Sequence, residues 1–122
     1  MEIKRVTVSN LHKRSAQQVF DYIANHLIVQ NKRSLGPDGH NCVYRDEIHG
    51  LSCAAGCLFT QRTYRKYHEN QSWRSLTRNN GVPGEHEDLI SELQFIHDGN
   101  APADWKTELK KVARRRLLAW RF

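Results

Sequence analysis

Apolar residues recur at helical spacing in two stretches that carry clear start signals. In residues 15–30, "SAQQVFDYIANHLIVQ", apolar side chains return every three or four positions and form one face. Ser15 is a good N-cap, and Gln18 stands where a capping box needs it. Residues 84–99 repeat the spacing, with acidic residues in the first turn, where the helix dipole favours them. Both stretches predict helices.

A third helix is predicted over residues 101–120. Pro102 suits its first turn, and the apolar arc runs from Trp105 to Trp120. A group of basic residues falls on the opposite side of this helix. Its members are Lys110, Lys111, Arg114 and Arg115.

Shorter patterns lie between these helices and at the two ends of the chain. Residues 42–53 predict a small β-hairpin that reverses at Gly50, and residues 72–81 predict one or two helical turns. Residues 54–67 begin with good helix formers, although Gly56 argues against a long regular helix. We expect residues 1–14 to form a strand or a flexible arm and residues 117–122 a basic tail.

The predicted fold is α+β and helix-dominated, with four to five helices and one small β-hairpin. A length of 122 residues suits a single domain over 1–122, and a composition of 39% hydrophobic and 26% charged residues is typical of a soluble folded chain. No apolar run has the length of a membrane helix, and the first residues do not resemble a signal peptide. We therefore expect a cytoplasmic protein without membrane partners.

Charge and cysteine content narrow the picture further. A net charge of +6 favours acidic partners, either nucleic acid or the acidic face of a protein. Three cysteines are an odd number, and a reducing compartment disfavours disulfides.

Residues 50–59, "GLSCAAGCLF", stand out because small and sulfur-bearing residues follow one another; we call this segment the cysteine turn. Gly50 and Gly56 suit positions where the backbone must turn or approach a neighbour closely. Ala54, Ala55 and the cysteines are interpreted as small packing residues, at which larger side chains would overpack the fold.

The combination of motifs resembles a family of small proteins carried by tailed bacteriophages and prophages. The similarity covers most of residues 15–113 and includes Cys-x-Tyr-Arg, Gly-x-x-Cys-Ala-x-Gly and Leu-Gln-x-x-His-Asp patterns. The matching residues are Arg33, Ser34, Cys42, Tyr44, Arg45, Gly50, Cys53, Ala54, Gly56, Leu93, Gln94, His97, Asp98 and Trp105. This chain departs from the family pattern after Phe59, where it is basic and aromatic. The resemblance implies a phage or prophage gene acting in the host bacterial cytoplasm, and it implies no activity.

Cysteine and histidine residues suggest two chemical alternatives. A tetrahedral zinc site would draw on Cys42, Cys53, Cys57 and a histidine, His40 or His49. A cysteine nucleophile would be Cys53, with His97 as base and Asp98 as its orienting partner. The competing interpretation is that the cysteines are buried and that His97 makes a structural hydrogen bond. We favour this interpretation and expect no cofactor.

The His97–Asp98 pair also invites comparison with metal-dependent phosphohydrolases, for which His86 and Asp104 would supply further ligands. The chain is short for that arrangement.

Basic and aromatic residues form two groups that suit phosphate or acidic-surface binding. One is the cationic group of the third helix, named above. The other lies in residues 60–74 and comprises Arg62, Arg65, Lys66, Trp73 and Arg74, interleaved with tyrosines. No named nucleic-acid-binding motif is present. We therefore expect a non-enzymatic accessory protein that binds a host or defence protein or a nucleoprotein complex, with a small Cys/His enzyme and a direct nucleic-acid binder as alternatives.

Overall fold

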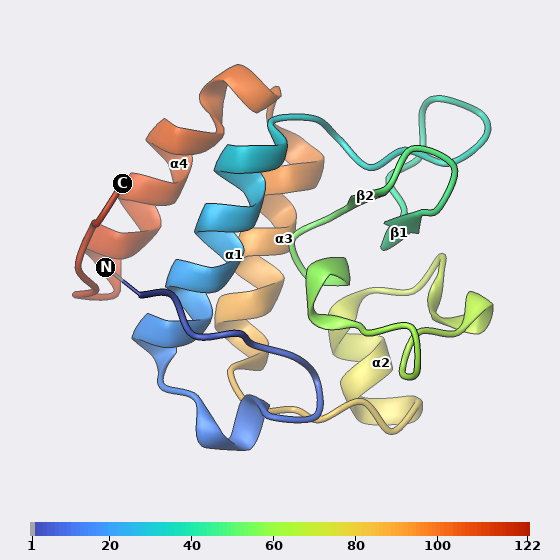
Figure 1. Ribbon diagram of the computed structural model, residues 1–122, viewed down its shortest axis with the longest axis horizontal. Helices are drawn as coiled ribbons and strands as arrows, with labels where there is room; N and C mark the ends of the chain where they lie inside the picture. The colour runs from blue at the N-terminus through green and yellow to red at the C-terminus, as the bar shows by residue number, and fades with distance from the viewer. Residues whose placement is uncertain (1) are drawn as a thin grey trace.

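The computed structural model describes residues 2–122, and three long helices lie beside a smaller region of loops (Figure 1). The helices are α1 (Ala16–Gln30), α3 (Glu87–Gly99) and α4 (Pro102–Arg115). Helix α1 contacts both α3 and α4, which also contact each other. The short helix α2 (Trp73–Asn79) packs on α3. The fold is therefore α+β and helix-dominated, as the sequence predicts.

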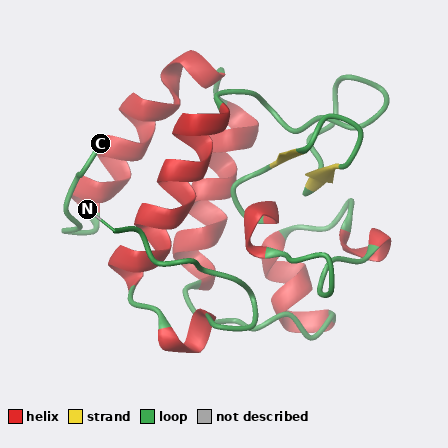
Figure 2. Cartoon of the chain, in the orientation of Figure 1, coloured by secondary structure: helices red, strands yellow, loops and turns green. Residues whose placement is uncertain are grey.

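The β structure is a small hairpin on the loop side of the molecule (Figure 2). Strands β1 (Arg45–Asp46) and β2 (Leu51–Ser52) are antiparallel, with Arg45 opposite Ser52 and Asp46 opposite Leu51. Gly50, just before β2, has φ +67°, a left-handed conformation that glycine adopts without steric cost. The predicted hairpin is confirmed.

Local signals account for the start of α1. The Ser15 side chain accepts a hydrogen bond from the Gln18 N–H, and the Gln18 side chain accepts one from the Ser15 N–H. This capping box satisfies two N–H groups that have no partner inside the helix. Farther along, Phe20, Ile23 and Leu27 are fully buried at the predicted helical spacing. The apolar face of α1 thus joins the core, which contains Trp73, Trp105 and Leu93 from the other helices.

The N-terminal segment differs from the expected strand or flexible arm. Its described part, residues 2–14, forms no strand and contains a 3₁₀ turn, η1 (Leu11–Lys13). Val6 and Leu11 are fully buried, and the Val8 N–H donates to the Leu58 carbonyl oxygen at 2.9 Å. Apolar burial fixes this segment against the core without a second strand to pair with.

Residues 54–67 form no long helix. Short 3₁₀ turns occur at η2 (Gly56–Leu58) and η3 (Lys66–His68). Between them the Thr63 hydroxyl accepts from the Thr60 N–H at 2.8 Å, which offers the backbone a partner outside a helix. The good helix-forming residues at the start of this segment are therefore not sufficient to produce a long helix.

Helix α4 ends earlier than the sequence predicts. The Leu118 N–H donates to the Ala113 carbonyl at 2.8 Å and the Leu117 N–H to the Arg114 carbonyl at 3.3 Å, which is a Schellman motif. Leu117 has φ +56°, so the helix stops at Arg115 without a glycine.

The last residues, expected as a basic tail or as part of the third helix, fold back onto α1. The Gln17 side chain binds the Ala119 backbone, accepting from its N–H at 2.8 Å and donating to its carbonyl at 3.1 Å. Trp120 packs edge-on against Phe20. Trp120 therefore reaches the core edge from the tail, outside the helix. Among the described residues, no helix has both the length and the apolar character needed to cross a membrane.

Candidate functional site

The cysteine turn is a close-packed backbone contact. Cys53, Ala54 and Ala55 are fully buried. A Cβ atom placed on Gly56 would lie 1.9 Å from the Tyr44 carbonyl oxygen, which also accepts the Cys53 N–H at 3.2 Å. Only glycine fits at position 56, because the cysteine turn lies directly against the backbone of Tyr44, just before β1. This agrees with the interpretation of Gly56 from the sequence.

Both cysteines of the turn are held as neutral thiols. Burial raises the pKa of Cys53 well above its ordinary value, and loss of hydration raises the pKa of Cys57 in the same way. Cys53 Sγ accepts from the Gly56 N–H at 3.3 Å, and the Cys57 thiol donates to the Ala54 carbonyl at 3.1 Å. A nucleophilic cysteine needs a lowered pKa, so this environment disfavours the catalytic alternative at Cys53.

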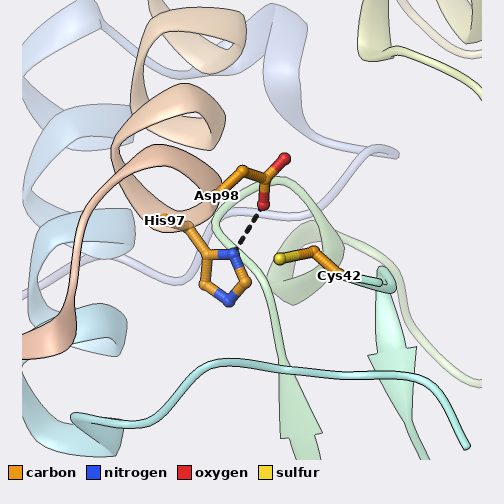
Figure 3. Close-up of side chains that lie close together, drawn as sticks. All are labelled: Cys42, His97 and Asp98. Atoms are coloured by element: carbon orange, nitrogen blue, oxygen red, sulfur yellow. Dashed lines mark hydrogen bonds and ion pairs between the residues drawn. The ribbon is translucent and has the colours of Figure 1, made fainter. Parts of the chain in front are cut away.

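His97 is fully buried in the last turn of α3 and lies beside Asp98 and Cys42 (Figure 3). Its Nδ1 is 2.7 Å from Asp98 Oδ1, and its Nε2 is 3.0 Å from the Ser34 backbone nitrogen. The ring also stacks on Trp105, with centroids 5.2 Å apart. His97 therefore links α3, α4 and the loop after α1.

The Ser34 contact determines the tautomer of His97. A backbone N–H can only donate, so Nε2 must accept, and the neutral ring carries its proton on Nδ1 and donates it to Asp98. Both ring nitrogens are thus used in structural hydrogen bonds. To act as a base for a cysteine, the ring would have to break one of them.

Asp98 extends this network to the cysteine turn. Its Oδ1 also accepts from Gln94 Nε2 at 2.8 Å, and Gln94 Oε1 accepts the Ala55 N–H at 2.8 Å. Burial raises the pKa of Asp98, but the hydrogen bonds from His97 and Gln94 outweigh it, and the net shift is downward. Gln94 therefore connects the His97–Asp98 pair to the cysteine turn, which contains Cys53, in an arrangement that stabilises the fold.

The structure brings together a set of potential metal ligands that differs from the zinc and phosphohydrolase sets suggested by the sequence. Within residues 2–122, the one group of three with donor atoms within 4.8 Å of one another is Cys42, His97 and Asp98. Cys53 and Cys57 do not join Cys42, and His49 is exposed and bonded to Asp46 at 2.8 Å. His86 and Asp104 are likewise outside the group.

Hydrogen bonding explains the Cys42–His97–Asp98 group better than a metal ion does. A metal on His97 Nδ1 would move the ring proton to Nε2, where it would face the buried Ser34 N–H. Burial, together with the nearby Asp98, raises the pKa of Cys42 to about 11, so its thiol keeps the proton. We interpret the group as a hydrogen-bonded cluster.

The two predicted basic groups lie on different sides of the molecule. Helix α4 forms one side, and the segment that contains η3 lies beyond α1 and α3 on the other (Figure 1). In residues 60–74, Trp73 is only 2% exposed, so its ring faces cannot stack on a base, as a nucleic-acid contact would need. Arg62, Lys66 and Arg74 are all exposed, and Arg74 is paired with Asp88 at 2.9 Å.

On α4, all four predicted cations are exposed, but two of them have acidic partners. Lys111 pairs with Glu108 at 2.8 Å, and Arg115 pairs with Glu92. Lys110 and Arg114 have no acidic partner within 4 Å among the described residues. Lys106, one turn earlier, shares this property and was missed by the sequence analysis, although its spacing of four residues from Lys110 signals the same face.

Comparisons of the chain with known protein families, with curated proteins and with solved structures find no match. Function is therefore inferred from the residues and their geometry.

Proposed function

We propose that this protein is a non-enzymatic phage or prophage accessory protein that binds an acidic surface of a host or defence macromolecule in the bacterial cytoplasm. The contact surface would be the cationic stripe, which we define as Lys106, Lys110 and Arg114 on α4. The observation that carries the proposal is that these three cations are exposed and unpaired within the described chain, while the neighbouring Lys111 and Arg115 are paired.

In the free protein, repulsion between the cations of the stripe destabilises α4, and a bound acidic partner would remove this repulsion. Its members are spaced four residues apart, so their side chains are neighbours along about 12 Å of helix. Like charges at this spacing destabilise a helix by a few tenths of a kcal/mol per pair, roughly. An acidic partner would offset the repulsion and would be drawn to the stripe by long-range attraction.

The surroundings of the stripe favour an acidic protein over single-stranded nucleic acid. Base stacking needs exposed aromatic rings near the cations. The one aromatic residue of α4, Trp105, is buried. The exposed aromatic side chains Phe95 and Tyr67 lie elsewhere: Phe95 lines a pocket between α3 and residues 69–74, and Tyr67 belongs to η3 on the other side of the molecule (Figure 1). We therefore favour a host or defence protein as the partner, with nucleic acid as an outcome that the experiment distinguishes.

The test compares two triple variants with the same change in net charge. The stripe variant carries Lys106→Gln, Lys110→Gln and Arg114→Gln, and the control carries Arg62→Gln, Arg65→Gln and Lys66→Gln on the other side. Tagged proteins are used to capture partners from phage-infected bacterial lysate, with and without nuclease, at low and at physiological salt. We expect the stripe variant to keep its melting temperature and to lose the partner, most strongly at low salt because surface charges are screened within about 8–10 Å at physiological salt.

Equal capture by the stripe variant and the parent would contradict the proposed surface. A partner lost on nuclease treatment would instead indicate a nucleic acid. A partner lost only with the control variant would move the surface to residues 60–74.

A further inference from the structure

A cavity of about 300 Å³ lies between the N-terminal segment, the segment that contains η3 and the loop that follows α2. Its volume is at the lower end of the range for small-ligand sites, roughly 300–1,000 Å³. Arg62 and Arg65 place two cations in the lining, and none of the described residues that line it is acidic. The neighbouring Glu69 is bound on the hairpin side, where it accepts from the Tyr44 N–H at 2.9 Å. The cavity therefore favours a small anionic ligand.

His68 contributes a buried hydrogen-bond donor to this lining. The residue is 3% exposed, and its ring is stacked on Phe59 with centroids 4.7 Å apart. The Arg65 backbone N–H donates to His68 Nδ1 at 3.0 Å, so Nδ1 is an acceptor. Desolvation, together with the charge of Arg65, lowers the pKa of His68 and keeps the ring neutral. The single ring proton is therefore on Nε2.

The His68 Nε2–H group has no hydrogen-bond partner among the described residues. Nε2 is also not one of the side-chain atoms that lack both a partner and accessible surface, so a ligand in the cavity can reach it. By contrast, the buried His97 uses both of its ring nitrogens within the chain. Buried donors are nearly always paired, so His68 calls for an acceptor inside the cavity.

The two arginines add charged donors beside His68. Both are exposed, and neither has a carboxylate within 4 Å among the described residues. Arg65 Nη1 donates to the carbonyl oxygens of Arg62 and Tyr64, each at 2.8 Å, which fixes the guanidinium and leaves its Nη2 without a partner in the described chain. Guanidinium N–H groups match the geometry of phosphate oxygens. Three side chains of the lining thus supply donors for one phosphate group.

An exposed aromatic ring accompanies these donors. Tyr67 lines the same cavity, is 59% exposed, and has its ring centroid 4.6 Å from that of His68. Exposed aromatic rings stack on nucleobases, because every base has a flat face. A ligand that joins a phosphate to a flat ring matches both features of the cavity.

We propose that this cavity binds a 5′-mononucleotide. Its phosphate would accept from His68, Arg62 and Arg65, and its base would stack on Tyr67. The site does not include the cationic stripe and does not depend on the function proposed above. The triple variant of Arg62, Arg65 and Lys66 should lose the nucleotide and still capture the partner of the stripe, so either proposal can fail without the other.

Three probes separate the parts of the ligand. AMP, ribose 5-phosphate and adenosine are titrated into the full chain in a phosphate-free buffer and followed by calorimetry. We expect AMP to bind saturably, and adenosine and ribose 5-phosphate to bind at least tenfold more weakly, because each lacks one of the two contacts. In ¹⁵N-labelled protein, AMP should shift the His68 Nε2 resonance, assigned from His68→Gln, and adenosine should leave it in place.

Two variants at exposed positions test the contacts without disturbing the core. Arg62→Gln should weaken AMP binding about tenfold, as loss of one charge-assisted hydrogen bond does. Tyr67→Leu should weaken AMP binding by a similar factor and leave ribose 5-phosphate binding unchanged. Lys32→Gln is the control, because Lys32 is exposed in the loop after α1 and outside the cavity lining, and it removes the same charge as Arg62→Gln.

Absence of AMP binding, or equal affinity of Arg62→Gln and the parent, would overturn the proposed site. A His68 Nε2 resonance that AMP leaves in place would do the same, since the phosphate would then lie outside the cavity. Equal binding of AMP and ribose 5-phosphate would overturn the assignment of the ligand as a nucleotide.

Discussion

At the scale of single residues, Gly56 shows how a close backbone contact constrains the sequence. The position has an ordinary backbone conformation, so the requirement for glycine comes from the Tyr44 carbonyl group alone. That group is backbone, held by the Cys53 N–H, and cannot rotate away as a side-chain end would. A methyl group at residue 56 can only be accommodated if the hairpin and the cysteine turn move apart.

We predict that Gly56→Ala lowers the free energy of unfolding by about 3 kcal/mol, the upper part of the range for overpacking in a core. Gly84→Ala is the control, because a Cβ atom there would have its nearest neighbour, Thr77 Cβ, at 4.0 Å. The control should stay within about 0.5 kcal/mol of the parent. Urea unfolding measures both. Equal midpoints for the parent and Gly56→Ala would contradict the close-contact explanation.

At the scale of elements, the end of α4 is made by hydrogen bonds and not by a favourable residue. The left-handed position of the Schellman motif is usually occupied by glycine, and here it is Leu117. This leucine is also 93% exposed, so its side chain buries little apolar surface that could offset the strain of the left-handed backbone. The motif is stabilised from outside, by Leu118 against the core and by the contact of Gln17 with Ala119.

We predict that Leu117→Gly raises the free energy of unfolding by roughly 0.5–1 kcal/mol. The left-handed backbone costs a non-glycine residue about 1–2 kcal/mol, and the greater freedom of glycine in the unfolded chain cancels part of the gain. Leu117→Ala keeps the Cβ atom and the strain, so it should leave stability nearly unchanged. Thermal unfolding of the three proteins separates the backbone effect from the side chain, and stabilisation by alanine equal to that by glycine would contradict it.

At the scale of the whole molecule, the half-buried His26 and the buried His68 connect stability to pH. His26 bonds to the Ser52 carbonyl through Nε2 at 2.9 Å, and desolvation lowers its pKa below the ordinary value of 6.5. His68 is 3% exposed and stacked on Phe59, and desolvation, with Arg65 nearby, lowers its pKa as well. The unfolded chain therefore binds more protons than the folded protein as the pH falls through 6.5. The stabilisation from these neutral rings is complete above that pH and is lost below it.

We predict that the free energy of unfolding decreases between about pH 7.5 and pH 5.5, a range in which surface carboxylates stay charged. His26→Gln, whose amide can still donate toward Ser52, should flatten this dependence, and adding His68→Gln should flatten it further. His12→Gln, at an exposed position, should follow the parent curve. Urea unfolding at several pH values measures the slopes. A parent stability that is constant or rises as the pH falls would contradict the role of these histidines.

Interactions within a few residues determined what could be predicted from the sequence. The capping box of Ser15 and Gln18, the turn at Gly50 and the helical spacing of buried residues in α1 and α3 act locally, and the structure confirms each of them. The restriction at Gly56 was also visible, because small residues in succession indicate a close approach.

Contacts between distant residues decided the rest. Ser34 is 63 residues from His97 in the sequence. Its N–H donates to His97 Nε2, so a histidine that the sequence suggested as a catalytic base has a structural role instead. Glu92, on another helix, pairs with Arg115 and so decides which cations of α4 remain free. Gln17 holds Ala119 across 102 residues and turns an expected tail into a packed segment. Hydrophobic periodicity reports which face of an element is buried, but only packing brings a particular donor to a particular acceptor, and that is why the sites could not be derived from the sequence alone.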